Sequence, residues 1–99
     1  MLELKIFIDE GDMYGGKPLA EHIMRYFMHH EIRGATIFAA LAGYGHKHHL
    51  HSPKQIGNVD EAPLLIMAID DEEKILKILP HIKDVIEEGL IVTSRVDEQ

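Results

Sequence analysis

The order in which two hydrophobic periods follow each other along this chain most constrains its fold. "LELKIFI", residues 2–8, alternates apolar and polar side chains with the period of two of a half-buried strand. "PLAEHIMRYFMHHEI", residues 18–32, repeats apolar residues at helical spacing, with Pro18 suited to the first position of a helix. Two more strands are predicted at "ATIFAALAG", residues 35–43, and at "PLLIMAI", residues 63–69.

A second helix and a last strand complete this order. Asp70 and Glu73 have the spacing of a capping box, which predicts that the helix begins there. The helical period continues across Pro80, so we expect Pro80 to kink the helix or divide it in two. Gly34 stands where a glycine cap of the first helix is expected. "LIVTSRV", residues 90–96, is the predicted fourth strand.

This order predicts an α+β fold. The 99 residues leave room for one domain, residues 1–99. Two right-handed crossovers then give a ferredoxin-like βαββαβ arrangement, a four-stranded antiparallel sheet with two helices on one face. The other face keeps apolar side chains such as Phe7, and an exposed patch of that kind indicates an interface. We therefore expect a homo-oligomer.

Composition excludes several classes of protein. The formal net charge is −7, and residues 55–99 carry four Lys or Arg against eleven Asp or Glu. Nucleic acid is not an expected partner, because no basic stripe is present. No apolar run approaches the ~20 residues of a membrane span, so we expect a cytoplasmic protein without membrane insertion. There is no cysteine, and Ser52 and Ser94 lie in no catalytic motif, so we do not expect an enzyme.

The first candidate site is "GDMYGGKPL", residues 11–19. Gly15 and Gly16 let the backbone approach a ligand closely, and Lys17 adds a cation. The predicted helix that follows adds free N–H donors and the positive end of its dipole. Tyr14 is placed to stack on a base or bond a phosphate. These features predict a small anion site, and the alternative is a tight turn that binds no ligand.

The second candidate site is the histidine-rich connection between the second and third strands, roughly twenty residues long. Connections of this length inside a compact domain are usually functional or mobile. The segment contains His46, His48, His49 and His51. Imidazoles suit zinc, copper or nickel, and they also respond to pH near neutrality. Besides metal binding and a pH response, a third interpretation is a solvated loop that becomes ordered with a partner.

Several stretches together resemble a known family. They are, in order, "GGKPLAEHI", "RGATIFAALAGYG", "PLLIMAID", "EKILKILPHI" and "EEGLIVTSRV". This series resembles an uncharacterised prokaryotic family, domain of unknown function 190, which is considered PII-like, and the resemblance covers nearly the whole chain. It implies a homotrimer whose sheets face inward, with adenine nucleotides or similar small anionic effectors between subunits. It also implies regulation of a partner protein rather than catalysis.

The resemblance assigns roles to particular segments. It makes residues 44–60 the flexible signalling loop and places the base of that loop at the ligand cleft. True PII proteins have a glycine-rich phosphate loop after the second helix, where this chain has only "EEGL", so we expect the turn at Gly15 to take over part of that role. The predicted nucleotide and anion site is Tyr14, Gly15, Gly16, Lys17, Gly43, Tyr44 and Gly45. The alternative hypothesis is a zinc- or copper-binding trimer that uses the cluster His46–His51.

Overall fold

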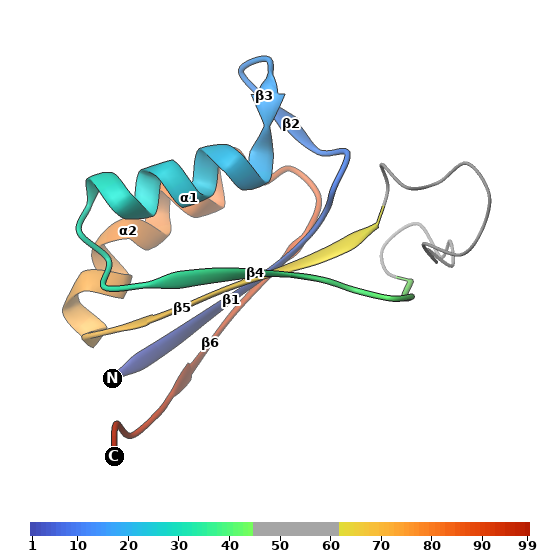
Figure 1. Cartoon of the computed structure of the whole chain (residues 1–99). Helices are drawn as coiled ribbons and strands as arrows, with labels where there is room; N and C mark the ends of the chain where they lie inside the picture. Colours follow the sequence, from blue (N-terminus) through green and yellow to red (C-terminus); the bar gives the residue numbers. More distant parts are fainter. Residues whose placement is uncertain (45–61) are drawn as a thin grey trace.

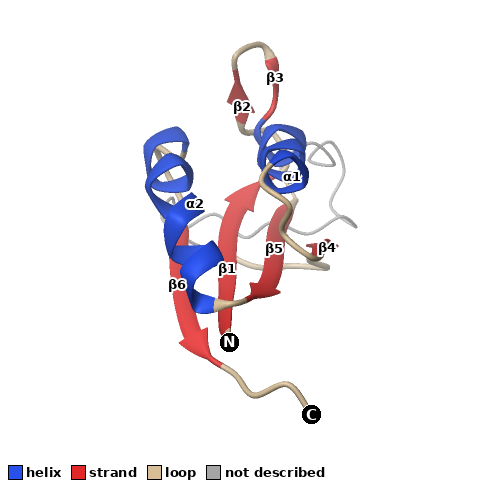
Figure 2. Cartoon of the chain, turned by 90° about the vertical axis from the view of Figure 1, so that its left-hand side faces the viewer, coloured by secondary structure: helices blue, strands red, loops and turns tan. Residues whose placement is uncertain are grey.

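The computed structural model describes residues 1–44 and 62–99, and Figure 1 shows the arrangement of its elements. The elements are β1 (Leu2–Asp9), β2 (Met13–Tyr14), β3 (Lys17–Pro18), α1 (Leu19–His29), β4 (Ala35–Ala39), β5 (Pro63–Asp70), α2 (Glu72–Val85) and β6 (Leu90–Arg95). The main sheet has the order β4-β5-β1-β6 with antiparallel neighbours, and both helices cover one of its faces (Figures 1 and 2). The predicted α+β, ferredoxin-like fold is confirmed, and a small hairpin, β2–β3, is added to it.

The core lies between the sheet and the two helices. Along β1 every second side chain is buried, because the period of two turns these residues toward the helices. Strand β5 alternates in the same way, and Ile66 pairs with Ile6 across the sheet. The helices close this layer with Leu19, Ile23 and Phe27 of α1 and Ile75, Ile78, Ile82 and Val85 of α2. The apolar spacing that predicted the elements is therefore the spacing that fills the core.

Helix α2 begins and continues differently from the prediction. Its N-cap is Asp71, and Asp70 is instead the buried last residue of β5, so the predicted capping box of Asp70 and Glu73 is wrong. The Asp70 carboxylate accepts the backbone N–H of Arg33 and that of Asp71, which occupies the oxygens that a cap would use. The helix is continuous through Pro80, so it is not divided. Pro80 is on an exposed position, where water can bond the carbonyl that loses its usual donor.

Helix α1 ends in a motif that needs a left-handed residue, but that residue is not Gly34. Glu31 adopts the left-handed conformation, with φ at 56°. The N–H of Ile32 donates to the carbonyl of Phe27, and the N–H of Glu31 donates to that of Met28. These two bonds are those of a Schellman motif. The prediction that Gly34 caps this helix is therefore wrong, because the helix stops at His29 and turns three residues before that glycine.

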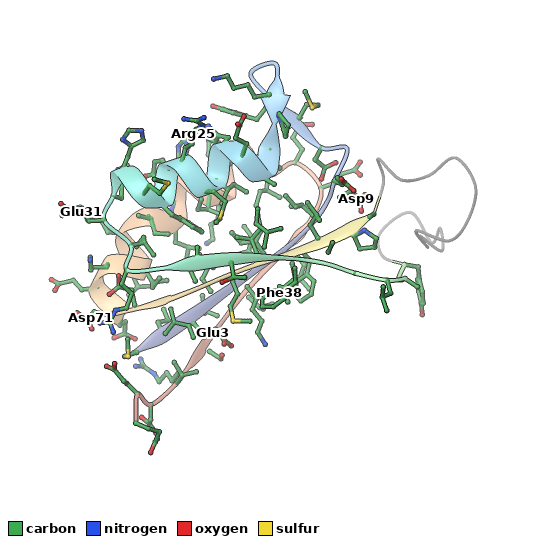
Figure 3. All side chains as sticks on the ribbon, in the orientation of Figure 1. Glu3, Asp9, Arg25, Glu31, Phe38 and Asp71 are labelled. Atoms are coloured by element: carbon green, nitrogen blue, oxygen red, sulfur yellow. The ribbon has the colours of Figure 1, made fainter. Side chains whose placement is uncertain are left out.

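The face of the sheet opposite the helices carries a row of apolar side chains. Phe38 of β4 pairs with Leu65 of β5, which pairs with Phe7 of β1, which pairs with Leu90 of β6. In the single chain Phe7 is 41% exposed, Phe38 47% and Leu90 56%. Figure 3 shows Phe38 on the side of the sheet away from the helices. We call these four residues the apolar row, and the two helices leave it uncovered (Figures 1 and 2).

Candidate nucleotide and anion site

The Gly-Gly-Lys stretch forms the turn and return strand of the β2–β3 hairpin. Tyr14 pairs with Lys17, and Gly15 and Gly16 between them have φ of 60° and 80°. Two central residues with positive φ are typical of a type I′ turn, which glycine adopts without strain. A Cβ at either glycine would meet no atom within 4 Å, so backbone conformation rather than space requires them. The turn alternative therefore accounts for both glycines, whether or not a ligand binds there.

The hairpin leads directly into the N-terminus of α1. Helix α1 begins at Leu19, one residue after the position expected from Pro18, and Pro18 is its N-cap without a side-chain bond. The N–H of Leu19 donates to the carbonyl of Asp12 at 2.8 Å, which holds the base of the hairpin against the helix. The next N–H groups of the first turn have no acceptor within the helix. Figure 1 shows the hairpin projecting beyond this end of α1. The positive end of the α1 helix dipole therefore lies beside the hairpin.

Lys17 and Tyr14 differ in the contacts that their side chains make. Within residues 1–44 and 62–99 the exposed Lys17 ammonium makes no ion pair. Tyr14 is 40% exposed, and its ring centroid lies 4.4 Å from that of His22 on α1. Because Tyr14 and Lys17 are paired across the hairpin, their side chains lie on the same face of it. That face carries a cation without an ion pair among the described residues and a partly covered aromatic ring. These are groups that suit a phosphate and an adjoining ring.

A groove that the sequence did not predict lies at the root of the hairpin. It has a volume of about 600 Å³ and is lined by Glu10, Gly11, Met13, Pro18, Ala20, Ile37 and Leu64. Most of these side chains are apolar, and they come from the hairpin, α1, β4 and β5. Periodicity could not find this wall, because it joins strands that are distant in sequence. Three of the lining residues, Gly11, Met13 and Pro18, belong to the glycine-rich stretch, so the sequence pointed to only part of this wall.

Gly43 and Tyr44 lie near Pro63, the first residue of β5. A Cβ at Gly43 would approach the Pro63 side chain to 3.5 Å, and the N–H of Ala40 donates to the Pro63 carbonyl at 2.8 Å. Tyr44 is 72% exposed. The structure therefore places this pair at the start of β5, while Tyr14, Gly15, Gly16 and Lys17 lie on the hairpin. A single site made of both groups stays a prediction.

The remaining predicted residues fall outside the described chain. Gly45 does so, and so do the four histidines of the metal hypothesis, His46, His48, His49 and His51. Among the described residues, no group of three or more His, Cys, Asp or Glu side chains is placed to hold a metal ion. No helix in this part of the chain is long and apolar enough to cross a membrane.

The sequence did not predict a histidine pair that lies next to the hairpin. The Nε2 atoms of His22 on α1 and His81 on α2 lie 3.0 Å apart. The His81 ring stacks on Tyr26 with centroids 4.1 Å apart, and Tyr14 lies against His22 from the other side. Burial lowers the pKa of His22 from its ordinary value of 6.5, and the neighbouring His81 ring lowers it further. No local pattern marks this pair, because the two histidines are 59 positions apart in the sequence.

Solved structures of PII-like proteins share this fold. The structure of CPII, described as a nitrogen regulatory PII-like protein from Thiomonas intermedia K12, bound to ADP, AMP and bicarbonate, superposes with a TM-score of 0.65. That match has 21% sequence identity and covers 94% of this chain and 82% of CPII. A second CPII structure, bound to ADP and bicarbonate, gives a TM-score of 0.57 at 20% identity with the same coverage.

Sequence comparisons give the family. A UPF0166 protein of Aquifex aeolicus (strain VF5) is 33% identical over 94 residues, which are 95% of this chain and 89% of that protein. The UPF0166 protein MJ1524 of Methanocaldococcus jannaschii is 34% identical over 98 residues, covering 92% of this chain and 84% of the relative. The model of the DUF190 family, described as "Uncharacterized ACR", matches residues 1–98. The chain therefore belongs to the DUF190 family and has the fold of PII-like proteins.

Proposed function

We propose that this chain is a PII-like regulatory protein that binds an adenine nucleotide, or a similar anionic metabolite, at clefts between the subunits of a cytoplasmic homotrimer. The observation that carries the proposal is the Lys17 ammonium, which makes no ion pair in the described part of the chain and lies on a hairpin whose root borders an apolar groove. Two structures of CPII, which shares the fold, are bound to ADP, and one of them is also bound to AMP. The role is regulatory, and no catalytic step is part of it.

The hairpin would hold the phosphate groups of the ligand. Lys17 supplies the positive charge, and the left-handed turn at Gly15 and Gly16 leaves the backbone free of side chains where a phosphate approaches. The first turn of α1 adds N–H donors and its dipole. This division of labour fits the absence of a glycine-rich loop between α2 and β6, where Glu87, Glu88, Gly89 and Leu90 stand.

The groove would hold the apolar part of the ligand. Met13, Ile37 and Leu64 form a wall that suits the face of a base, whereas Tyr14, the next residue along β2, packs on His22 of α1. Among the described residues the groove is open along one side, and in this proposal a neighbouring subunit encloses the nucleotide there. In this proposal Gly43, Tyr44 and Gly45 approach the ligand in the assembled protein.

The apolar row supports the assembly. Phe7, Phe38, Leu65 and Leu90 extend across all four strands on the face that the helices leave open. A contiguous apolar patch of this kind is normally covered by another chain. Sheets that face inward around a threefold axis would bury the row of every subunit at once. Residues 44–60, which we predict to signal to a partner protein, lie largely outside the described residues.

Calorimetric titration tests the proposal directly. The purified protein is titrated with AMP, ADP, ATP and cyclic dinucleotides, and its mass is measured by sedimentation equilibrium in the same buffer. We expect binding of at least one adenine nucleotide to a species of three chains. A protein of that mass that gives no heat with any of these ligands would contradict the assigned ligand class, and a monomer that still binds would contradict the inter-subunit cleft.

A further inference from the structure

Five aromatic rings lie in contact along the helices and the hairpin. Their order is Tyr14, His22, His81, Tyr26 and His30, and neighbouring centroids are 4.0 to 5.2 Å apart. The series begins on β2, crosses to α1, passes to α2 and returns to α1. It therefore connects the hairpin to the packing of the two helices, and the contact between His22 and His81 is its central link.

The contact between the two histidines depends on how many protons they hold. With their Nε2 atoms 3.0 Å apart, one nitrogen donates a hydrogen and the other accepts it. A single added proton preserves this bond, because a charged imidazole still faces a neutral one. A second proton removes the acceptor, since both Nε2 atoms then carry hydrogen and both rings are positive. The doubly protonated pair must separate.

The surroundings offer limited compensation for two charges. About one helical turn from the pair lie Arg25 and Tyr26 of α1 and Lys77 and Asp84 of α2, and the nearby hairpin carries Tyr14 and Lys17. Arg25 is paired with Glu21, with 3.6 Å between Nη2 and Oε1. Lys17 and Lys77 add positive charge, and the exposed carboxylate of Asp84 lies one turn beyond His81. Burial and His81 already lower the pKa of His22 below 6.5, which agrees with a site that resists the second proton.

We infer that the His22–His81 pair is a proton-sensitive contact that couples acidification to the position of the β2–β3 hairpin. While the pair holds at most one proton, His22 supports the Tyr14 ring against α1. When both rings are charged, His22 leaves His81 and Tyr14 loses its neighbour. Because Tyr14 pairs with Lys17 across the turn, the two side chains move together. The protein then reports a fall in pH through the hairpin.

Nuclear magnetic resonance of the ligand-free protein tests this inference. The ring signals of His22 and Tyr14 are followed from pH 8 to pH 4.5. We expect both to change with one common midpoint below 6.5, the ordinary pKa of histidine. Tyr14 signals that stay constant while His22 titrates would overturn the inference, and so would separate midpoints.

Two variants separate this coupling from a general effect of acid. His81→Gln keeps an oxygen that accepts the His22 N–H but cannot gain a proton, so the midpoint of His22 should move to higher pH and Tyr14 should stop following it. His29→Gln replaces an exposed histidine at the end of α1, outside the ring series, and should leave both titrations unchanged. A His81→Gln protein whose Tyr14 ring signals change with pH as they do in the wild type would contradict the coupling.

The consequence for ligands rests on the proposed function. If the hairpin binds a nucleotide, the affinity for that nucleotide should fall on acidification more steeply in the wild type than in His81→Gln. The ligand-free titration is independent of this step. A protein with coupled His22 and Tyr14 signals but no affinity for nucleotides would overturn the proposed function and leave the inference standing. Binding without coupled signals would do the reverse.

Discussion

Arg33 and Asp70 are joined twice: the Arg33 backbone N–H donates to Asp70 Oδ2 at 2.9 Å, and its Nε lies 3.4 Å from Oδ1. The two residues are 37 positions apart. Lys74 adds an ion pair to Asp70 at 3.3 Å, and its Nζ also donates to the Glu31 carbonyl. Asp70, a residue that is only 1% exposed, therefore holds the turn after α1 against the junction between β5 and α2. Figure 3 shows Glu31 and Asp71 at this same end of the molecule.

Asp70→Asn should lower the free energy of unfolding by about 1 to 3 kcal/mol, the usual cost of leaving buried donors unsatisfied. The amide has the size of the carboxylate but turns an N–H₂ toward donors and removes the negative charge. Urea unfolding followed by circular dichroism measures the change. Asp71→Asn is the matched control, because Asn is an equally good N-cap and the Asp71 side chain is exposed. Equal stability of the two variants would show that the buried carboxylate contributes nothing.

The same carboxylate should make the fold sensitive to acid. Burial alone would raise the pKa of Asp70, but the N–H groups of Arg33 and Asp71 and the Lys74 ammonium outweigh burial and hold that pKa below 3.8. The unfolded chain therefore binds this proton more readily than the folded chain does. The stabilisation is complete above the ordinary pKa and is lost as the pH falls through 3.8 toward the lower folded value. The stability advantage of the wild type over Asp70→Asn should shrink over that range, and an advantage that grew there would refute the assignment.

The strands and helices could be predicted from sequence because their apolar spacing is local. Leu4 and Ile6 alternate along β1, and Ile75 and Ile78 follow the helical period of α2, so each element shows its buried face within a few residues. The β2–β3 hairpin could not be predicted in this way, since strands of two residues show no period.

Contacts between residues that are distant in sequence could not be predicted either. The residues around Asp70 predict a helix cap, whereas its partners in the structure include the Arg33 backbone, which only the folded chain brings near. His22 and His81 meet because two helices pack side by side, and neither residue has a local signal. The anion site was predicted from glycines and a lysine, and the apolar groove beside it depends on Ile37 and Leu64 arriving from separate strands.

Glu31→Gly should raise the free energy of unfolding by about 0.5 to 1 kcal/mol. Glu31 has φ at 56°, where a side chain is strained and glycine is not. Thermal and urea unfolding both measure the gain. Met28→Gly is the comparison: this exposed residue lies inside α1, where glycine should cost about 1 kcal/mol. Destabilisation by both substitutions would contradict the claim that the left-handed backbone at Glu31 is strained.

Phe7→Lys should dissociate the proposed trimer. Phe7 is at the middle of the apolar row, and a charge there must be desolvated when sheets pack together. Sedimentation equilibrium should show a shift from three chains to one, with the circular dichroism of the folded domain unchanged. Leu76→Lys places the same charge on an exposed position of α2 and should leave the trimer intact. A trimeric Phe7→Lys protein would place the interface elsewhere.

The affinity of the Lys17→Ala protein for ADP, measured by calorimetry beside that of the wild type, tests the central claim most directly. The removed ammonium is the unpaired cation of the hairpin in the described chain, and charge-assisted bonds to phosphate contribute roughly 1.5 to 3 kcal/mol. We predict that Lys17→Ala weakens binding about tenfold or more, while Lys83→Ala, an exposed lysine in the last turn of α2, binds as the wild type does. Equal affinity of wild type and Lys17→Ala, or binding of ADP by neither, would contradict the account.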